Sequence, residues 1–492
     1  MVNRLGQIGL GAGALALGVV GIVAVRTATY KPPSASSGSA IRVAAPLAIN
    51  ADLAATHLSQ AIQIQTVSHQ DIADDHPEEW DRLHAWLATT YPASHGAMTR
   101  EVIAGRTLLY TWKGSDPKLA PIILMAHQDV VPVTPGTEAD WKHPPFSGAI
   151  ADGAIWGRGS IDDKGNLVTL FEGTETLIKS GFKPRRTVMI LSTHDEEVRG
   201  EGATAAAGLL ARRGIKAQFV LDEGLAYISD NPITGGPAAV IGIAEKGYGT
   251  LKIVAKATGG HSSAPPKDGG GVVALSRAIV AIADHPFPMK LSGPGAAMLS
   301  ALAPGGKFAI RMAVANQWLL SKLIIAQTAA SPAGAALLHT TIAPTMLKGS
   351  PKENVLPQDA TASINYRIAP GDTGETVMAR ARAAIGDLPV ELSWPKPPQN
   401  PSAVSSTQSA GWKVISAVAG EQARVPVAPG LVTAGTDSRH LEGVADDVYR
   451  FQPMTFALKD TGMIHGTNEH LTLTNLSQCV QFYARLIATA AS

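Results

Sequence analysis

ILMAHQDVVP, residues 123–132, is the stretch that indicates the fold class of this chain. The apolar run at residues 122–125 predicts a buried strand, and His127 and Asp129 follow at its end. In α/β proteins, ligands and catalytic groups gather at the carboxyl ends of parallel strands. The sequence therefore predicts a functional site where this strand ends.

Two later segments repeat the same design. In TVMILSTHDEE, an apolar run at residues 188–191 is followed by His194, Asp195, Glu196 and Glu197, and residues 219–221 are followed by Asp222 and Glu223. A helical pattern at residues 204–213 separates these two runs. Strands that alternate with helices predict an α/β fold, here a doubly wound mixed sheet that forms a catalytic domain.

A second region, residues 247–398, has a different pattern. Its expected elements are a strand at 248–257, a helix at 271–283, strands at 340–347 and 360–367, a helix at 375–385 and a strand at 390–394. The order βαββαβ predicts an inserted α+β lid domain. An apolar insertion, residues 295–338, interrupts it. The catalytic domain is thus expected in two parts, residues 46–246 and 399–492.

The N-terminal residues predict a targeting or anchoring segment. Residues 8–25 are 18 consecutive apolar or glycine residues, with Arg4 before them and Arg26 after them. This length is near the lower limit for crossing a bilayer and long for the apolar part of a signal peptide. Residues 1–29 therefore predict a membrane anchor or signal, followed by a linker at residues 30–45. We expect a membrane-anchored or exported protein, with its orientation left open by positive charges on both flanks.

Charge and cysteine content exclude several classes of partner and site. The chain has 41 basic and 40 acidic residues, which gives a formal net charge of +1 and leaves no basic surplus for binding nucleic acid. The single cysteine, Cys479, excludes an internal disulfide and a zinc site built from several thiolates. Any bound metal is therefore expected to be held by histidine and carboxylate side chains.

Five residues are the candidate metal ligands: His127, Asp162, Glu197, Asp222 and His465. Each of them alone has an ordinary structural explanation, such as a capping aspartate in a glycine turn or a solvated acidic run. The coincidence that three apolar strands all end in acidic or histidine groups favours a metal site. Nitrogen and oxygen ligands in this ratio suit zinc, cobalt or manganese, and five ligands with one shared carboxylate suit two adjacent ions.

Eight motifs carry a family resemblance. They are HQDVVP at 127–132, GRGSIDDKG at 157–165, HDEE at 194–197, LDEG at 221–224, GGHSSAPP at 259–266, KENVLP at 352–357, GTDSRH at 435–440 and IHGTNE at 464–469. In this order they resemble the motifs of the aminoacylase/carboxypeptidase S family of two-zinc metallopeptidases. The resemblance covers about residues 50–490. It is closest to the branch of carboxypeptidase S and the N-fatty-acyl amino acid hydrolases.

The resemblance implies a role for each candidate in the catalytic domain. It implies that His127 and Asp222 bind one zinc ion and that Glu197 and His465 bind the other. Asp162 would bridge the two ions. Cobalt or manganese are possible substitutes for zinc. Asp129 would orient His127, as carboxylates beside ligating imidazoles do. Glu196 would be the general base, and the Asp162–Asp163 peptide is typically cis in the family.

The resemblance also implies roles for residues of the lid and of the GTDSRH motif. His261 would stabilise the oxyanion, in some relatives from a partner subunit, and the lid would form a homodimer. Asn354 and Arg367 would bind substrate, with Arg367 forming a fork for a carboxylate. Gly435 and Thr436 would offer further donors. The insertion at residues 295–338 could instead cover the dimer face and supply His261 within one chain.

These residues predict a two-zinc metallohydrolase that cleaves an amide bond adjacent to a free carboxylate. The first hypothesis is a carboxypeptidase that releases a C-terminal amino acid from short peptides. The alternative is an N-acyl amino acid amidohydrolase, with fatty-acyl amino acids among its candidate substrates. A third hypothesis, a non-catalytic binding protein with the same fold, is disfavoured because Glu196 and all five candidate ligands are present.

Overall fold

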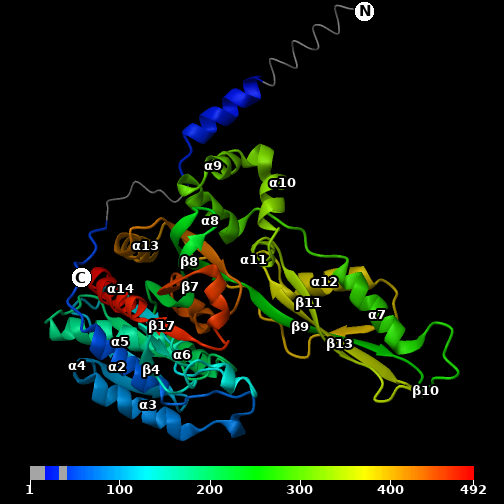
Figure 1. Ribbon diagram of the computed structural model, residues 1–492, viewed down its shortest axis with the longest axis horizontal. Coiled ribbons are helices and arrows are strands. Elements are labelled where there is room, and N and C mark those ends of the chain that lie inside the picture. The colour runs from blue at the N-terminus through cyan, green and yellow to red at the C-terminus, as the bar shows by residue number, and fades with distance from the viewer. Residues whose placement is uncertain (1–16, 33–40) are drawn as a thin grey trace, which may run out of the picture.

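The structure is a computed structural model that describes residues 17–32 and 41–492 (Figure 1). Its largest sheet has eight strands in the order β1-β2-β6-β3-β7-β16-β8-β15. These strands are β1 (Thr99–Ile103), β2 (Thr107–Trp112), β3 (Ile122–Met125), β6 (Val188–Ser192), β7 (Phe219–Asn231), β8 (Gly236–Glu245), β15 (Val427–Val432) and β16 (Val448–Phe456). Strand β3 pairs in parallel with β6 and β7, whereas β2 pairs antiparallel with β1 and β6. The predicted mixed α/β sheet is confirmed.

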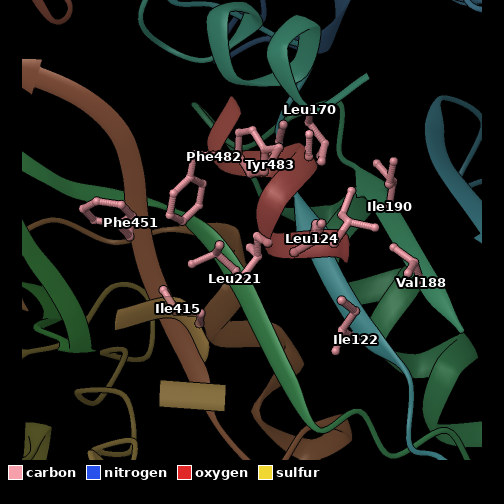
Figure 2. Packing of buried hydrophobic residues seen from close by; sticks show 14 of the residues in the cluster. Ile122, Leu124, Leu170, Val188, Ile190, Leu221, Ile415, Phe451, Phe482 and Tyr483 are labelled. Carbon is pink, nitrogen blue, oxygen red and sulfur yellow. The ribbon is translucent and has the colours of Figure 1, made fainter. Parts of the chain in front are cut away.

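Helices cover both faces of this sheet. On one face, the β3 residues Ile122 and Leu124 share a core with α5 (Lys164–Lys179), α13 (Ala410–Ala423) and α14 (Leu473–Ala490), as Figure 2 shows. On the other face, Ile123 and Met125 share a core with α6 (Glu201–Arg212). Neighbouring residues of a strand point to opposite faces, so an unbroken apolar run is what a strand covered on both sides needs.

Three helices near the N-terminus and a small three-stranded sheet complete this part of the fold. They are α2 (Ala51–Ile62), α3 (Pro77–Thr90), α4 (Pro92–Ala97) and a small sheet of β17 (His470–Thr472), β5 (Ala154–Trp156) and β4 (Ala149–Ala151). The small sheet joins the segment before α5 to the segment before α14, because β5 and β17 pair antiparallel. This pairing brings the loops that contain Asp162 and His465 to the same place.

A second, four-stranded sheet has the order β11-β13-β9-β14. Its strands are β9 (Gly247–Lys256), β11 (Thr341–Lys348), β13 (Asp359–Ile368) and β14 (Glu391–Ser393), and all its pairings are antiparallel. With α7 (Gly270–Ala283) and α12 (Gly374–Ile385) it has its own apolar core. A short ribbon of β10 (Gly260–His261) and β12 (Val355–Leu356) lies beyond α7, at the end away from the large sheet (Figure 1). The division of the chain into domains at residues 246 and 398 stays a prediction.

The apolar insertion is helical. It comprises α8 (Gly293–Leu302), a 3-10 turn (Ala303–Gly305), α9 (Phe308–Ala315), α10 (Gln317–Thr328) and α11 (Pro332–Ala336). Leu299 and Leu302 of α8 share a small core with Ala238 of β8 and Ala428 of β15. The insertion is therefore fixed to the edge of the large sheet.

The predicted N-terminal anchor is only partly described. Residues 17–28 are helical, and residues 1–16 lie outside the described residues. Within residues 17–32 and 41–492, no helix combines the length and the apolar character needed to cross a bilayer.

The contact between α5 and α14 gives a test of the fold. A Cβ atom added at Gly173 would lie 2.9 Å from the backbone nitrogen of Ala484 and 3.1 Å from the carbonyl oxygen of Val480. We expect Gly173→Ala to lower the free energy of unfolding by about 1–3 kcal/mol, because neither backbone can move away cheaply. Urea unfolding curves would measure the change.

Gly208→Ala is the matched control. It lies in α6, and its added Cβ would meet only the flexible end of Arg212, at 3.4 Å. It should gain up to about 1 kcal/mol from helix propensity. A Gly173→Ala protein as stable as Gly208→Ala would contradict the packing described for α5 and α14.

Candidate active site

The candidate site lies where β3 and β6 end, beside residues 222 and 223 of β7, which continues to Asn231. His127 follows β3, Glu196 and Glu197 follow β6, and Glu223 lies within β7. Two further loops reach this place, one before α5 with Asp162 and one before β17 with His465. Parallel pairing of β3 with β6 and β7 explains why residues distant in sequence meet here.

His127 is the most enclosed of these side chains, with 2% of its surface exposed. Its Nδ1–H donates to the carbonyl oxygen of Asp129 at 3.0 Å. Its Nε2 atom faces Asp162 Oδ1 at 2.9 Å and Glu223 Oε1 at 3.5 Å. Because Nδ1 carries the proton, Nε2 is the atom that is available to bind a metal.

Asp162 lies between two imidazoles. Its Oδ2 atom is 3.1 Å from His465 Nε2, and the same Nε2 atom is 3.1 Å from Glu197 Oε2. Burial acts to raise the pKa of Asp162, but the hydrogen bonds from His127 and His465 outweigh burial and lower that pKa below its ordinary value. With one oxygen toward each imidazole, Asp162 has the geometry of a bridging carboxylate.

Asp129 connects His127 to the acidic segment after β6. It is fully buried, and its Oδ2 atom accepts a hydrogen bond from Ser68 Oγ at 2.7 Å. Its carboxylate also accepts from the backbone N–H groups of Glu196 and Glu197, each at 3.2 Å. His127 Nδ1 is closer to the backbone carbonyl of Asp129, at 3.0 Å, than to its carboxylate, at 3.4 Å, so the orienting role of this carboxylate stays a prediction.

Glu196 lies beside the ligand cluster. One oxygen of Glu196, one of Glu223 and one nitrogen of His127 all lie within 4.8 Å of one another. Burial raises the pKa of Glu196 well above its ordinary value, and the neighbouring carboxylates raise it further. A carboxyl group whose pKa is raised in this way is suited to accept a proton and return it.

The neighbouring acids Asp222 and Glu223 differ from the prediction. The carboxylate of Asp222 accepts hydrogen bonds from the backbone N–H of Glu223, at 3.0 Å, and from that of Ser438, at 2.9 Å. Glu223 instead faces His127. In this structure the carboxylate of Asp222 is engaged by backbone N–H groups, whereas that of Glu223 lies 3.5 Å from His127 Nε2. This geometry favours Glu223 over the predicted Asp222 as the metal ligand.

The donor set fits two divalent cations. Two imidazoles and three carboxylates converge, as His127, Asp162, Glu197, Glu223 and His465. Burial raises the pKa of Glu223 to about 8, and the nearby charge of Asp162 raises it in the same direction. Carboxylates packed this closely need compensating positive charge, and divalent ions supply it. Histidine and carboxylate ligands without thiolates suit zinc, cobalt or manganese.

Two residues outside the predicted set hold the Asp162 loop in place. The carboxylate of Glu469 accepts hydrogen bonds from the backbone N–H groups of Ile161, at 2.8 Å, and Asp162, at 3.1 Å. Its other oxygen pairs with Arg158 Nη1 at 2.7 Å, and both side chains are buried. The Asp162–Asp163 peptide is cis, as the resemblance implied. Glu469 lies in the IHGTNE motif, but its contacts with Arg158 and the Asp162 loop join residues that are more than 300 positions apart in the sequence.

The predicted lid residues contact other partners than the cluster in this structure. His261 belongs to β10, at the tip beyond α7 (Figure 1), where its ring hydrogen-bonds to Ser263 Oγ at 2.8 Å. The backbone carbonyl of Asn354 accepts from Ser262 beside it, at 3.1 Å. The guanidinium of Arg367 lies 4.9 Å from the ring centre of Tyr248.

Gly435 and Thr436 lie beside a different acid, the buried Glu245. The backbone N–H and the hydroxyl of Thr436 both donate to Glu245 Oε2, at 3.1 and 3.0 Å. Arg450 and Arg439 pair with the same carboxylate at 2.8 and 3.2 Å. The donors of Thr436 are therefore already engaged within the protein in this structure.

The fold and the cluster together define a metal-dependent hydrolase of the α/β class. Residues 123–489 match Peptidase family M20/M25/M40, and the chain belongs to this family. The predicted family resemblance is thereby confirmed.

Named relatives extend this finding. The chain is 35% identical over 441 residues to "Probable carboxypeptidase S-like 2" of Dictyostelium discoideum, covering 88% of this chain and 84% of that protein. It is also 35% identical over 441 residues to the N-fatty-acyl-amino acid synthase/hydrolase PM20D1 of Xenopus tropicalis, covering 87% and 84%. Two solved structures share the fold. They are the M20 family metallo-carboxypeptidase Sso-CP2 from Sulfolobus solfataricus (TM-score 0.61, 15% identity, 88% of this chain and 98% of that chain) and human carnosine dipeptidase 1 (TM-score 0.62, 14% identity, 90% and 96%).

The two neighbouring acids of β7 give a direct test of the ligand assignment. We expect the wild-type chain to bind two equivalents of zinc and Glu223→Gln to bind about one, because an amide is a poor replacement for a ligating carboxylate. Asp222→Asn should keep two equivalents, since its carboxylate serves backbone N–H groups. Mass spectrometry after dialysis would measure the zinc content of the wild-type chain and of the two variants. Loss of zinc in Asp222→Asn with full retention in Glu223→Gln would restore the original assignment.

Proposed function

We propose that this chain is a two-metal hydrolase that cleaves an amide bond adjacent to a free carboxylate, acting as a carboxypeptidase on short peptides. The observation that carries the proposal is the position of Glu196. Its half-buried carboxyl group lies beside His127 and Glu223, next to the convergent ligand set. A general base at such a place is what hydrolysis of an unactivated amide needs.

The residues of the site suit each step of the reaction. Two divalent ions, when bound, acidify a water molecule and polarise the substrate carbonyl. Glu196 removes a proton from the attacking water as the new C–O bond forms. The same carboxyl group then gives that proton to the amide nitrogen as the C–N bond breaks. The backbone carbonyl of Asp129 keeps His127 oriented by accepting its Nδ1–H, and the Ser68 hydroxyl holds Asp129 by donating to its carboxylate.

In this proposal, residues of the second sheet bind the free carboxylate of the substrate. Arg367 offers the planar fork that a carboxylate requires. His261 would donate to the oxyanion, and loss of one such donor typically lowers the rate by about 10²–10³. Since β10 lies at the tip of the second sheet, His261 must reach the cluster by closure of that sheet or from a second copy of the chain in a homodimer.

The second candidate substrate is an N-acyl amino acid, including one with a fatty-acyl chain. It presents the same amide bond next to the same carboxylate, so the cluster would act on it without change. Two observations favour it: the relative named N-fatty-acyl-amino acid synthase/hydrolase, and the apolar insertion at α8–α11. The predicted export or membrane anchoring through residues 8–25 would also expose the site to such substrates.

Glu196→Gln tests the role of the general base. The substitution keeps the size of the side chain and removes its ability to carry a proton. We expect turnover to fall by about 10²–10⁴ while zinc content and the unfolding midpoint stay at the wild-type values. The matched control is Glu201→Gln at the start of α6, which should keep full turnover. An undiminished rate for Glu196→Gln would remove it from this role.

A paired substrate panel tests the proposed reaction and selects the substrate. Release of free amino acid would be measured on dipeptides and on N-acyl amino acids that share the same C-terminal residue. Chelation should abolish release, and zinc should restore it, with cobalt or manganese as weaker or equal substitutes. The faster half of the panel identifies the chain as a peptidase or an acylase. Release that is unaffected by complete metal removal would contradict the two-metal proposal.

A further inference from the structure

The helices α9 and α10 of the insertion expose large apolar side chains. Phe308 of α9 is 63% exposed, and Trp318, Leu319 and Leu323 of α10 are 54%, 50% and 51% exposed. At about 100° of rotation per residue, the three α10 side chains fall within an arc of roughly 140° on one side of the helix. Several large apolar side chains exposed together on neighbouring helices, such as this apolar strip, mark a candidate interaction surface.

Basic residues border this surface, and acidic residues are missing from its sequence. Lys307, Arg311 and Lys322 lie in or beside α9 and α10, and Lys322 lies within the same arc as Trp318. No aspartate or glutamate occurs between Asp284 and Glu353. A chain whose overall charge is nearly balanced has thus concentrated positive charge around its exposed apolar strip.

The N-terminal helix is attached to the same surface. Arg26 Nε donates to the carbonyl oxygen of Ala315 at 3.1 Å, and the Tyr30 hydroxyl donates to that of Ser300 at 3.0 Å. The buried Asn316, between α9 and α10, donates through Nδ2 to Thr27 Oγ1 at 3.2 Å. Figure 1 shows the helix leaving the molecule beside α9 and α10.

This attached helix has the same character as the strip. Leu17, Val20, Ile22 and Val25 are all exposed, and no acidic residue occurs before Asp52. Helices that are apolar on nearly all sides need an apolar environment around them. The N-terminal helix is thus joined to the α9–α10 junction and has the same apolar and basic character as the strip.

We propose that α9, α10 and the helix at residues 17–28 form a docking surface for an anionic lipid bilayer. Apolar side chains bordered by lysine and arginine are what binding in the interfacial plane of such a membrane requires. A second copy of this surface would carry the same positive charge and be repelled. Because α8 is packed against β8 and β15, docking would hold the large sheet at a fixed position relative to the bilayer.

The single native cysteine allows a site-specific test in the full-length chain. Cys479 is buried, and burial raises the pKa of its thiol well above the ordinary value, so it is protected from labelling. Leu323→Cys would carry a polarity-sensitive fluorophore on the proposed surface. Val102→Cys is the matched control, since it is 51% exposed on β1, the edge strand opposite β15. Unfolding midpoints would confirm that both labelled proteins are folded.

Vesicles of phosphatidylcholine with phosphatidylglycerol are the probe. We expect the fluorescence emission of the label at position 323 to shift to the blue when vesicles are added. This label should also be quenched by spin-labelled lipid and protected from aqueous iodide. The label at position 102 should show none of these changes. Replacing Lys307, Arg311 and Lys322 by glutamine should raise the lipid concentration at half-shift by roughly fivefold per charge removed.

Three outcomes would overturn the proposal. The first is a chain that co-sediments with vesicles while its label at position 323 stays accessible to iodide, which would assign binding to the N-terminal segment alone. The second is an equal response to pure phosphatidylcholine, which would remove the role of charge. The third is a blue shift that depends on protein concentration without lipid, which would assign this surface to contact between copies of the chain.

Discussion

Repulsion between like charges is the constraint on which the rest of this structure depends. Asp162 has one oxygen toward His127 and the other toward His465, and Glu197 and Glu223 complete the same cluster. Carboxylates that are this close and this buried are compatible with a folded protein only when positive charge lies among them. The two imidazoles supply part of that charge, and a pair of divalent ions would supply the remainder.

The surrounding fold fixes the cluster from several directions at once. Parallel pairing of β3 with β6 and β7 delivers three of its segments to one place, and the pairing of β5 with β17 delivers the other two. Buried charged groups then set the orientation: Asp129 accepts from the segment after β6, and Glu469 accepts from the Asp162 loop. The ligand geometry is thus a property of the sheet topology and of these two carboxylates together.

The large sheet and most of the candidate site could be predicted from sequence because both leave local patterns. Apolar runs that end in histidine or acidic residues predicted β3, β6 and the start of β7, together with the candidate residues beside them. The choice between Asp222 and Glu223 as the metal ligand could not be made from sequence, since adjacent acids give the same pattern; the contact of Glu223 with His127 is what favours Glu223. Arg158 and Glu469 stand in two of the quoted motifs, but their ion pair could not be predicted because the two residues are far apart in the sequence. The distance of His261 from the cluster depends on how two sheets are placed relative to each other, which no local pattern records.

The most direct test of this account is anomalous X-ray diffraction from crystals of the protein loaded with zinc, recorded on both sides of the zinc absorption edge. The account predicts two peaks about 3.5–4 Å apart, one beside His127 and Glu223 and the other beside Glu197 and His465, with Asp162 between them. A single peak, or a peak coordinated by Asp222 in place of Glu223, would contradict it.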